Sequence, residues 1–249
     1  MMNPSRFVSA VLIACAVSAV AHAQTAERPA IKEGDKWRFL SKVEELKNGT
    51  LTSSSREVDA WVTRVGSHSF IQATKPVDSN LPPREADINL DWSRSQIRDG
   101  AEKIVGRPYL YPLKPGLSWD TDATDPHPAP GVKTLRNKLH FTVLGWEEVK
   151  VPAGSFKALK IETEGNWFRE FEPVGPHTSS TTTVSPAGQS TLVNAQGGRT
   201  PDPVGGRMYR LTWYVPEVKR EVKVIAEEYT PTGVVQHRTT QELESYSVD

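Results

Sequence analysis

The chain has 249 residues, with 30 basic and 30 acidic side chains, one cysteine and seven tryptophans. This balance argues against a nucleic-acid partner, because such proteins carry a basic excess or a basic stripe. The sequence also lacks the Lys/Arg clusters that bind anionic membranes. Its lone cysteine rules out an intrachain disulfide.

The N-terminal segment has the three parts of a secretory signal peptide. Arg6 precedes an apolar run that ends in Ala21-His22-Ala23, with small residues at the positions that signal peptidase reads. The run is shorter than the roughly 20 residues of a membrane-spanning helix. We therefore expect a signal peptide over residues 1–23, cleavage between Ala23 and Gln24, and a mature chain over 24–249 without a transmembrane helix.

A second interpretation of the same segment is a lipoprotein signal. Leu12-Ile13-Ala14-Cys15 resembles a bacterial lipobox, in which the cysteine is lipidated and becomes the new N-terminus. We favour plain secretion, because the apolar run continues past Cys15 to the better cleavage site. Loss of Cys15 leaves a mature chain without thiols, which favours a protein of the bacterial periplasm.

The first part of the mature chain reads as strands joined by turns. Residues 37–46 form an extended segment that meets Asn48-Gly49, a strong hairpin signal. Residues 56–65 alternate in part, with Val58, Ala60 and Val62 on one face and Trp61 on the other. Residues 68–74 predict a third strand.

The middle of the chain combines strands with two expected exceptions. Ser93–Asp99 is predicted as a two-turn helix, with Ser93 as its N-cap and Gly100 as its stop. Asp120–Lys133 is rich in Pro and Asp, and we expect a loop. Residues 139–144 alternate like a half-buried strand, and Pro152-Ala153-Gly154 predicts the turn of a hairpin that returns over 156–162.

Residues 173–207 differ from the rest in composition. They are mostly Ser, Thr, Gly and Pro, too polar to offset the entropy of ordering, so we expect a flexible excursion within one β-rich domain. Strands are predicted over 208–215, 221–229 and 234–246. The predicted fold class is all-β: a curved antiparallel sheet, either a half-barrel or a sandwich, with long irregular loops and at most one short helix.

We find no constellation that indicates catalysis, a metal site or a cofactor. The five histidines of the mature chain are widely spaced, and glycine-rich phosphate loops and the common serine-nucleophile motifs are absent. Glu162 and Glu164 share one strand face at a spacing that suits a glycoside hydrolase. Nearby lysines make cross-strand charge pairing the simpler explanation.

Tryptophan is the one residue type in notable excess. Its ring can stack on a ligand, line an apolar pocket or fill a β core. Our candidates for ligand contact are Trp61, Trp119 and Trp213.

Several blocks occur in an order that resembles a family of exported bacterial β-rich proteins of unknown function. The family pattern reads Pro-Leu-x-x-Gly-x-x-Trp, then Val-Pro-Ala-Gly-Thr-Phe, then Trp-Tyr-x-Pro. The matching segments here are 34–37, 112–119, 148–158, 213–220 and 242–246. Ser155 replaces the usual threonine, and the segment 173–207 is longer than is typical.

The resemblance implies a curved antiparallel sheet, akin to the half-barrels that carry lipoproteins or lipids in the bacterial envelope. It supplies no catalytic residues. We expect a non-enzymatic envelope protein that binds an apolar or amphipathic ligand, or a partner protein, on its curved sheet. The alternatives are an assembly factor that offers an edge strand and a hydrolase that uses Glu162 and Glu164.

Overall fold

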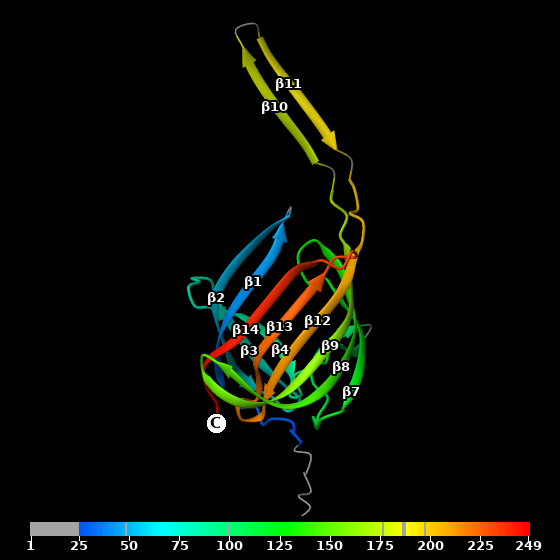
Figure 1. The fold of residues 1–249 in the computed structure, drawn as a ribbon. Helices are drawn as coiled ribbons and strands as arrows, with labels where there is room; N and C mark the ends of the chain where they lie inside the picture. Colours follow the sequence, from blue (N-terminus) through cyan, green and yellow to red (C-terminus); the bar gives the residue numbers. More distant parts are fainter. Residues whose placement is uncertain (1–24, 48, 99, 176, 186–187, 197) are drawn as a thin grey trace, which may run out of the picture.

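A computed structural model describes residues 25–47, 49–98, 100–175, 177–185, 188–196 and 198–249, and Figure 1 shows its fold. Within these residues, one short 3-10 helix, η1 (Pro216–Val218), accompanies the strands. The strands are β1 (Lys36–Lys47), β2 (Thr50–Val65), β3 (Ser69–Pro76), β4 (Arg84–Asn89), β5 (Arg94–Arg98), β6 (Ala101–Gly106), β7 (Ser118–Pro126), β8 (Val132–Val151), β9 (Gly154–Phe171), β10 (His177–Ser185), β11 (Gly188–Gln196), β12 (Val204–Val215), β13 (Arg220–Tyr229) and β14 (Val235–Ser247).

Ten of the strands form one antiparallel sheet in the order β4-β3-β2-β1-β14-β13-β12-β9-β8-β7. Two further pairs, β5 with β6 and β10 with β11, form separate two-stranded sheets. The large sheet is strongly curved (Figure 1). The predicted all-β class with a curved antiparallel sheet is therefore confirmed.

Alternation along the strands gives the curved sheet two different faces. Trp37 and Phe39 are buried, whereas Lys36 and Arg38, one residue away on β1, point to the opposite face. Most of the buried side chains of the other strands lie on the same face as Trp37 and Phe39. The largest members of the core are Trp37, Tyr214, Phe39, Phe70, Leu113, Leu159, Ile161 and Leu243. We call the face that carries this core concave and the other face convex.

The predicted hairpins form where the turn residues indicated them. Gly49 lies between β1 and β2 with a φ of 78°, a conformation that glycine adopts without strain. Pro152 and Ala153 connect β8 to β9, and residues 230–234 connect β13 to β14. These turns fix the register of the neighbouring strands, which decides which side chains reach the concave face.

The predicted helix over Ser93–Asp99 is wrong, because β5 occupies this segment. Trp92 has a φ of 65°, which directs the chain into a tight turn. The Ser93 hydroxyl bonds Asp91 Oδ1 at 2.5 Å and also accepts from Asn89. The side chain that suggested an N-cap therefore stabilises a turn instead.

The hairpin of β5 and β6 follows β4 and precedes β7, the two edge strands of the large sheet. Gln96 Nε2 on β5 donates to Asp125 Oδ1 on β7 at 2.7 Å, so this hairpin is attached to the β7 edge.

The segment Asp120–Lys133 is less irregular than its composition predicts. β7 continues to Pro126 and β8 begins at Val132. Asp122 bonds Arg136 on β8 through two contacts of 2.8 and 2.7 Å, and Asp120 contacts His140 at 2.8 Å. Cross-strand charge pairs offset the low strand propensity of aspartate.

Residues 173–207 also contain strands. β10 and β11 pair with each other along their whole length and extend away from the large sheet (Figure 1). β12 begins at Val204. The expected signal peptide, its cleavage site after Ala23 and the alternative lipid site at Cys15 lie outside the described residues.

Candidate functional site

The concave face encloses a cavity of about 400 Å³. Its walls come from β3, β4, β5, β6, β7, β8, β9, β12 and β13, from the turn at Trp92, and from the chain between β6 and β7. The lining residues are Gln72, Ile88, Trp92, Arg94, Val105, Gly106, Arg107, Pro108, Tyr109, Thr121, Ala123, Asn137, Leu139, Phe141, Ile161, Thr163, Met208, Arg210, Thr212, Arg220 and Glu221. The period of two along a strand places alternate residues of β7, β8, β9 and β12 in this wall.

One part of the wall is apolar. Leu139 and Phe141 on β8 lie beside Ile161 on β9, and Met208 on β12 completes this surface. Phe141 and Ile161 are buried in the core cluster, so the cavity is continuous with the core. Such a surface suits the hydrocarbon part of a ligand.

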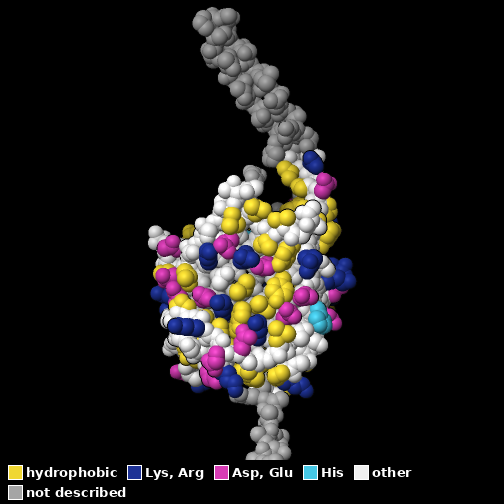
Figure 2. Space-filling model, in the orientation of Figure 1, with side chains coloured by type: hydrophobic (Ala, Val, Ile, Leu, Met, Phe, Trp, Pro, Cys, Tyr) yellow, Lys and Arg dark blue, Asp and Glu magenta, His cyan; other side chains and the backbone are white. Residues whose placement is uncertain are grey.

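Four arginines give another part of the wall a positive charge. Arg94, Arg107, Arg210 and Arg220 line the cavity, and Glu221 is the one carboxylate among its lining residues. The whole chain has no net charge, and the face in Figure 2 shows basic and acidic side chains interspersed. The cationic cavity is therefore a local arrangement and does not follow from overall composition.

Of these arginines, Arg220 has the most contacts that fix the position of its guanidinium. Its guanidinium lies 5.0, 4.7 and 4.9 Å from the ring centres of Trp37, Phe39 and Trp92, a cation–π arrangement. Its Nη2 donates to Glu221 Oε1 at 2.7 Å. The aromatic rings and the carboxylate together fix the direction of the guanidinium.

Glu221 is ionised in spite of its surroundings. Burial raises its pKa, but the charge of Arg220 and hydrogen bonds from Arg220 and Tyr109 outweigh burial, so the pKa lies below the ordinary 4.5. Tyr109 donates its hydroxyl to Glu221 Oε2 at 2.7 Å. Burial first, and then the charge of Glu221, raise the pKa of Tyr109 well above 10.0, which keeps this tyrosine a donor.

Several polar atoms of the wall have no hydrogen-bond partner in the described part of the chain. They are Nε2 of Gln72, Nε1 of Trp92, Nε of Arg107, Nε of Arg210, and both Nε and Nη1 of Arg220. Buried polar groups in proteins are nearly always bonded. A cluster of exceptions in one cavity therefore indicates a binding site.

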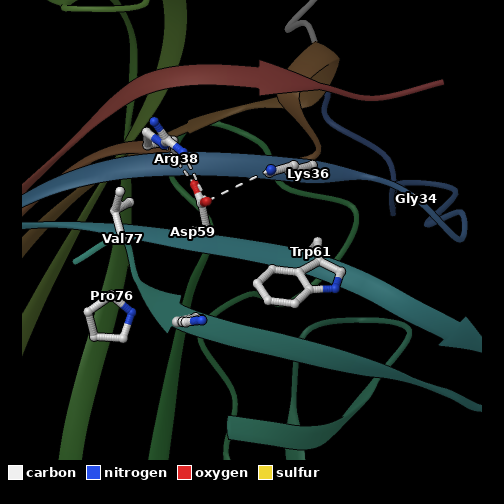
Figure 3. Close-up of a pocket in the computed structure, with 8 residues that line it drawn as sticks. Gly34, Lys36, Arg38, Asp59, Trp61, Pro76 and Val77 are labelled. Carbon is white, nitrogen blue, oxygen red and sulfur yellow. Dashed lines mark hydrogen bonds and ion pairs between the residues drawn. The ribbon is translucent and has the colours of Figure 1, made fainter. Parts of the chain in front are cut away.

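A second hollow, of about 500 Å³, lies on the convex face and contains Trp61 (Figure 3). Its lining residues include three cations, Lys36, Arg38 and Lys75, and one carboxylate, Asp59. Arg38 bonds Asp59 through contacts of 2.7 and 3.0 Å, and Lys36 lies 3.8 Å from the same carboxylate. None of the residues that line this hollow has a buried polar atom without a partner among the described residues. We therefore regard the concave cavity as the better candidate.

The other two tryptophan candidates have different positions. Trp119 stacks on Phe141, with ring centres 4.8 Å apart, and lines a separate hollow of about 350 Å³ rather than the cavity itself. Trp213 lies on the convex face, where its Nε1 bonds Glu147 at 2.5 Å and Lys160 lies over its ring. The three tryptophans are thus not brought together, and their contact with a ligand stays a prediction.

Glu162 and Glu164 lie on the convex face of β9, because Ile161 and Thr163, which alternate with them, line the cavity. Glu162 accepts a hydrogen bond of 2.8 Å from Tyr209. Burial and this bond raise the pKa of Tyr209 to about 12. Within the described ranges, no cluster of three or more His, Cys, Asp or Glu suits a metal ion.

The residues that sequence reasoning missed are the arginines and Trp92. One signal was present: Arg210 occupies the inward position of β12 between Met208 and Thr212. An inward arginine is unusual in a strand with one buried face. The contributions of Arg107 and Arg220 come from a loop and a strand end, where alternation gives no guidance.

Comparisons with known proteins give few relatives. Neither a protein-family model nor a curated protein matches the chain significantly. A solved structure from Bacteroides fragilis NCTC 9343, described as an exported protein with a YmcC-like fold, has a TM-score of 0.42 and 14% identity. One from Parabacteroides distasonis ATCC 8503, described as a lipoprotein, has a TM-score of 0.41 and 13% identity. Each alignment covers 90% of this chain and 100% of the other.

In the part of the chain that the structure covers, no helix has the length and hydropathy needed to cross a membrane.

Proposed function

We propose that this chain is an exported, non-enzymatic binding protein of the periplasm that holds a small amphipathic ligand in its concave cavity. The observation that carries the proposal is the cavity wall, which combines an apolar surface with buried polar atoms that lack partners. The signal-like segment over residues 1–23 supports export.

The size of the cavity limits the ligand. Its volume of about 400 Å³ is at the low end of the roughly 300–1,000 Å³ of small-molecule sites. At ~30 Å³ for each heavy atom, the space that a water molecule takes in the liquid, it holds on the order of a dozen heavy atoms. A short acyl chain with a polar group fits this limit, and a whole phospholipid does not.

The direct test is native mass spectrometry of the protein purified from its own cell envelope. Ala123→Phe places a ring in the cavity from β7, whereas Thr124→Phe places the same ring on the opposite face of that strand. We expect a bound small molecule on the wild type and on the Thr124→Phe variant, and none on the Ala123→Phe variant. A wild-type protein without any bound mass would contradict the proposal.

The same samples test the alternatives. Glu162→Gln combined with Glu164→Gln is expected to leave the bound mass unchanged, because both side chains point away from the cavity. Loss of turnover of a substrate in this variant would instead support the hydrolase.

The edge-strand alternative rests on β4 and β7, which each pair with a single strand of the sheet. The β5–β6 hairpin is attached to β7 through Gln96 and so occupies part of that edge. We therefore rank the edge-strand alternative below ligand binding in the cavity.

A further inference from the structure

The unpartnered atoms of the cavity are all hydrogen-bond donors. A guanidinium has five N–H donors and no acceptor, and an indole nitrogen is a donor only. The same holds for the amide nitrogen of Gln72, the remaining atom of the set. A ligand that satisfies this wall must therefore bring acceptor atoms.

The charge of the wall narrows the choice of acceptor. Arg220 has an ionic partner in Glu221, whereas neither Arg107 nor Arg210 has an ion pair with a described residue. Arg107 and Arg210 are half-buried, and a partly desolvated charge without a counter-charge is unfavourable. The acceptor that offsets this cost best is an anion.

We infer that the ligand carries an oxyanion, a carboxylate or a phosphate, which Arg107, Arg210 and Arg220 bind while its apolar part contacts the Leu139–Phe141 wall. The inference rests on the proposed function and specifies the chemistry of its ligand. Arginine suits this role because its planar fork binds carboxylate or phosphate through two parallel hydrogen bonds.

Arg210 is the residue on which the assignment depends most. The rings and Glu221 around Arg220 are sufficient to explain that arginine as a structural group. Arg210 projects from the middle of β12 between Thr163 on β9 and Ala226 on β13, and neither neighbour is acidic. Its Nε is buried and unpartnered, so the fold itself gives no reason for its charge.

The test is calorimetric titration of the mature protein at neutral pH with eight-carbon probes that differ only at the head. Octanoate and octyl phosphate carry the two oxyanions, octanol is the neutral control, and inorganic phosphate is the head alone. We expect an anionic probe to bind about 10- to 100-fold more tightly than octanol, the effect of one charge-assisted contact. The tighter of the two anions identifies the headgroup.

Arg210→Met should abolish this preference and leave octanol affinity unchanged. The matched control is Arg136→Met, which removes the same charge from the convex face, where Arg136 pairs with Asp122, and should keep the preference. Without ligand, Arg210→Met should melt no lower than the wild type, because it breaks no ion pair with a described residue and replaces a half-buried charge by an apolar side chain. If it does not fold, Arg107→Met replaces it in the same titrations.

The outcomes separate the inference from the proposed function. Equal affinity for octanol and both anions would contradict the inference of an oxyanion headgroup. The proposed function, binding of an amphipathic ligand, would still stand. If inorganic phosphate binds as tightly as octyl phosphate, the apolar part of the ligand contributes nothing to the affinity, which would contradict its contact with the apolar wall. Failure of every eight-carbon probe to bind would contradict the proposed function itself, and an unchanged preference in Arg210→Met would overturn the role of that arginine.

Discussion

Lys219 follows η1 with a φ of 67° and links three distant parts of the chain. Its ammonium donates to Asp35 Oδ1 and Oδ2 at 2.9 and 2.8 Å, and to the main-chain oxygen of Asp249 at 2.7 Å. The side chains of Lys219 and Asp35 are 9% and 1% exposed. Removal of either partner would leave the other charged and buried.

Lys219→Met is therefore expected to lower the free energy of unfolding by about 3–5 kcal/mol. Urea denaturation measures the change. The control is Lys42→Met, which removes an exposed pair with Glu44 and should cost less than about 1 kcal/mol. Similar costs for the two variants would show that the buried pair is not a determinant of stability.

Glu221 gives a pH dependence whose sign follows from its lowered pKa. A carboxyl with a lower pKa in the folded state stabilises the protein fully above its unfolded pKa, near 4.5, and this stabilisation is lost as the pH falls through the folded value. Glu221→Gln, which cannot ionise, should lack this contribution.

We therefore expect Glu221→Gln to cost about 1–3 kcal/mol at neutral pH, and the difference from the wild type to shrink as the pH falls below about 4.5. Melting curves of both proteins across this range measure the difference. A gap that stays constant down to the lowest pH would contradict an ionised Glu221.

Among the strands, the close approach of β8 and β9 depends on Gly165. A Cβ at this position would lie 2.0 Å from the main-chain oxygen of Lys138 and 2.9 Å from Leu139 Cα. Both are backbone atoms and cannot rotate away. An alanine would push the two strands apart beside the cavity wall.

Gly165→Ala is expected to destabilise the protein by about 1–3 kcal/mol, as overpacking usually does. Gly175→Ala is the matched control, because a Cβ there meets nothing within 4 Å. Chemical denaturation of the two variants gives the comparison, and equal stabilities would show that β8 and β9 can separate without cost.

Strands and hairpins were largely predictable, because turn residues such as Asn48-Gly49 and Pro152-Ala153 act locally. The errors arose where local composition was overridden. The ion pair of Asp122 with Arg136 keeps β7 extended. In the turn at Trp92, the Ser93 hydroxyl donates to Asp91 and does not cap a helix. The cavity was not predictable, because it is formed by side chains from strands that meet only in the folded sheet.

For the molecule as a whole, the curved sheet separates two chemical environments. The convex face carries ion pairs such as Arg38 with Asp59, while the concave face carries the core and the arginines whose buried nitrogen atoms lack partners. The seven tryptophans of the chain are distributed over both faces. Their indole N–H groups can therefore report separately on each environment.

The central claim is that a ligand with an oxyanion head binds the concave cavity. The most direct measurement is the indole region of a ¹⁵N-labelled NMR spectrum during titration with octanoate, with resonances assigned by single Trp→Phe variants. We expect the largest shift at Trp92, whose Nε1 is an unpartnered donor in the cavity, and none at Trp61 or Trp213. Shifts at Trp61 or Trp213 with Trp92 unchanged would place the ligand on the convex face and contradict the account.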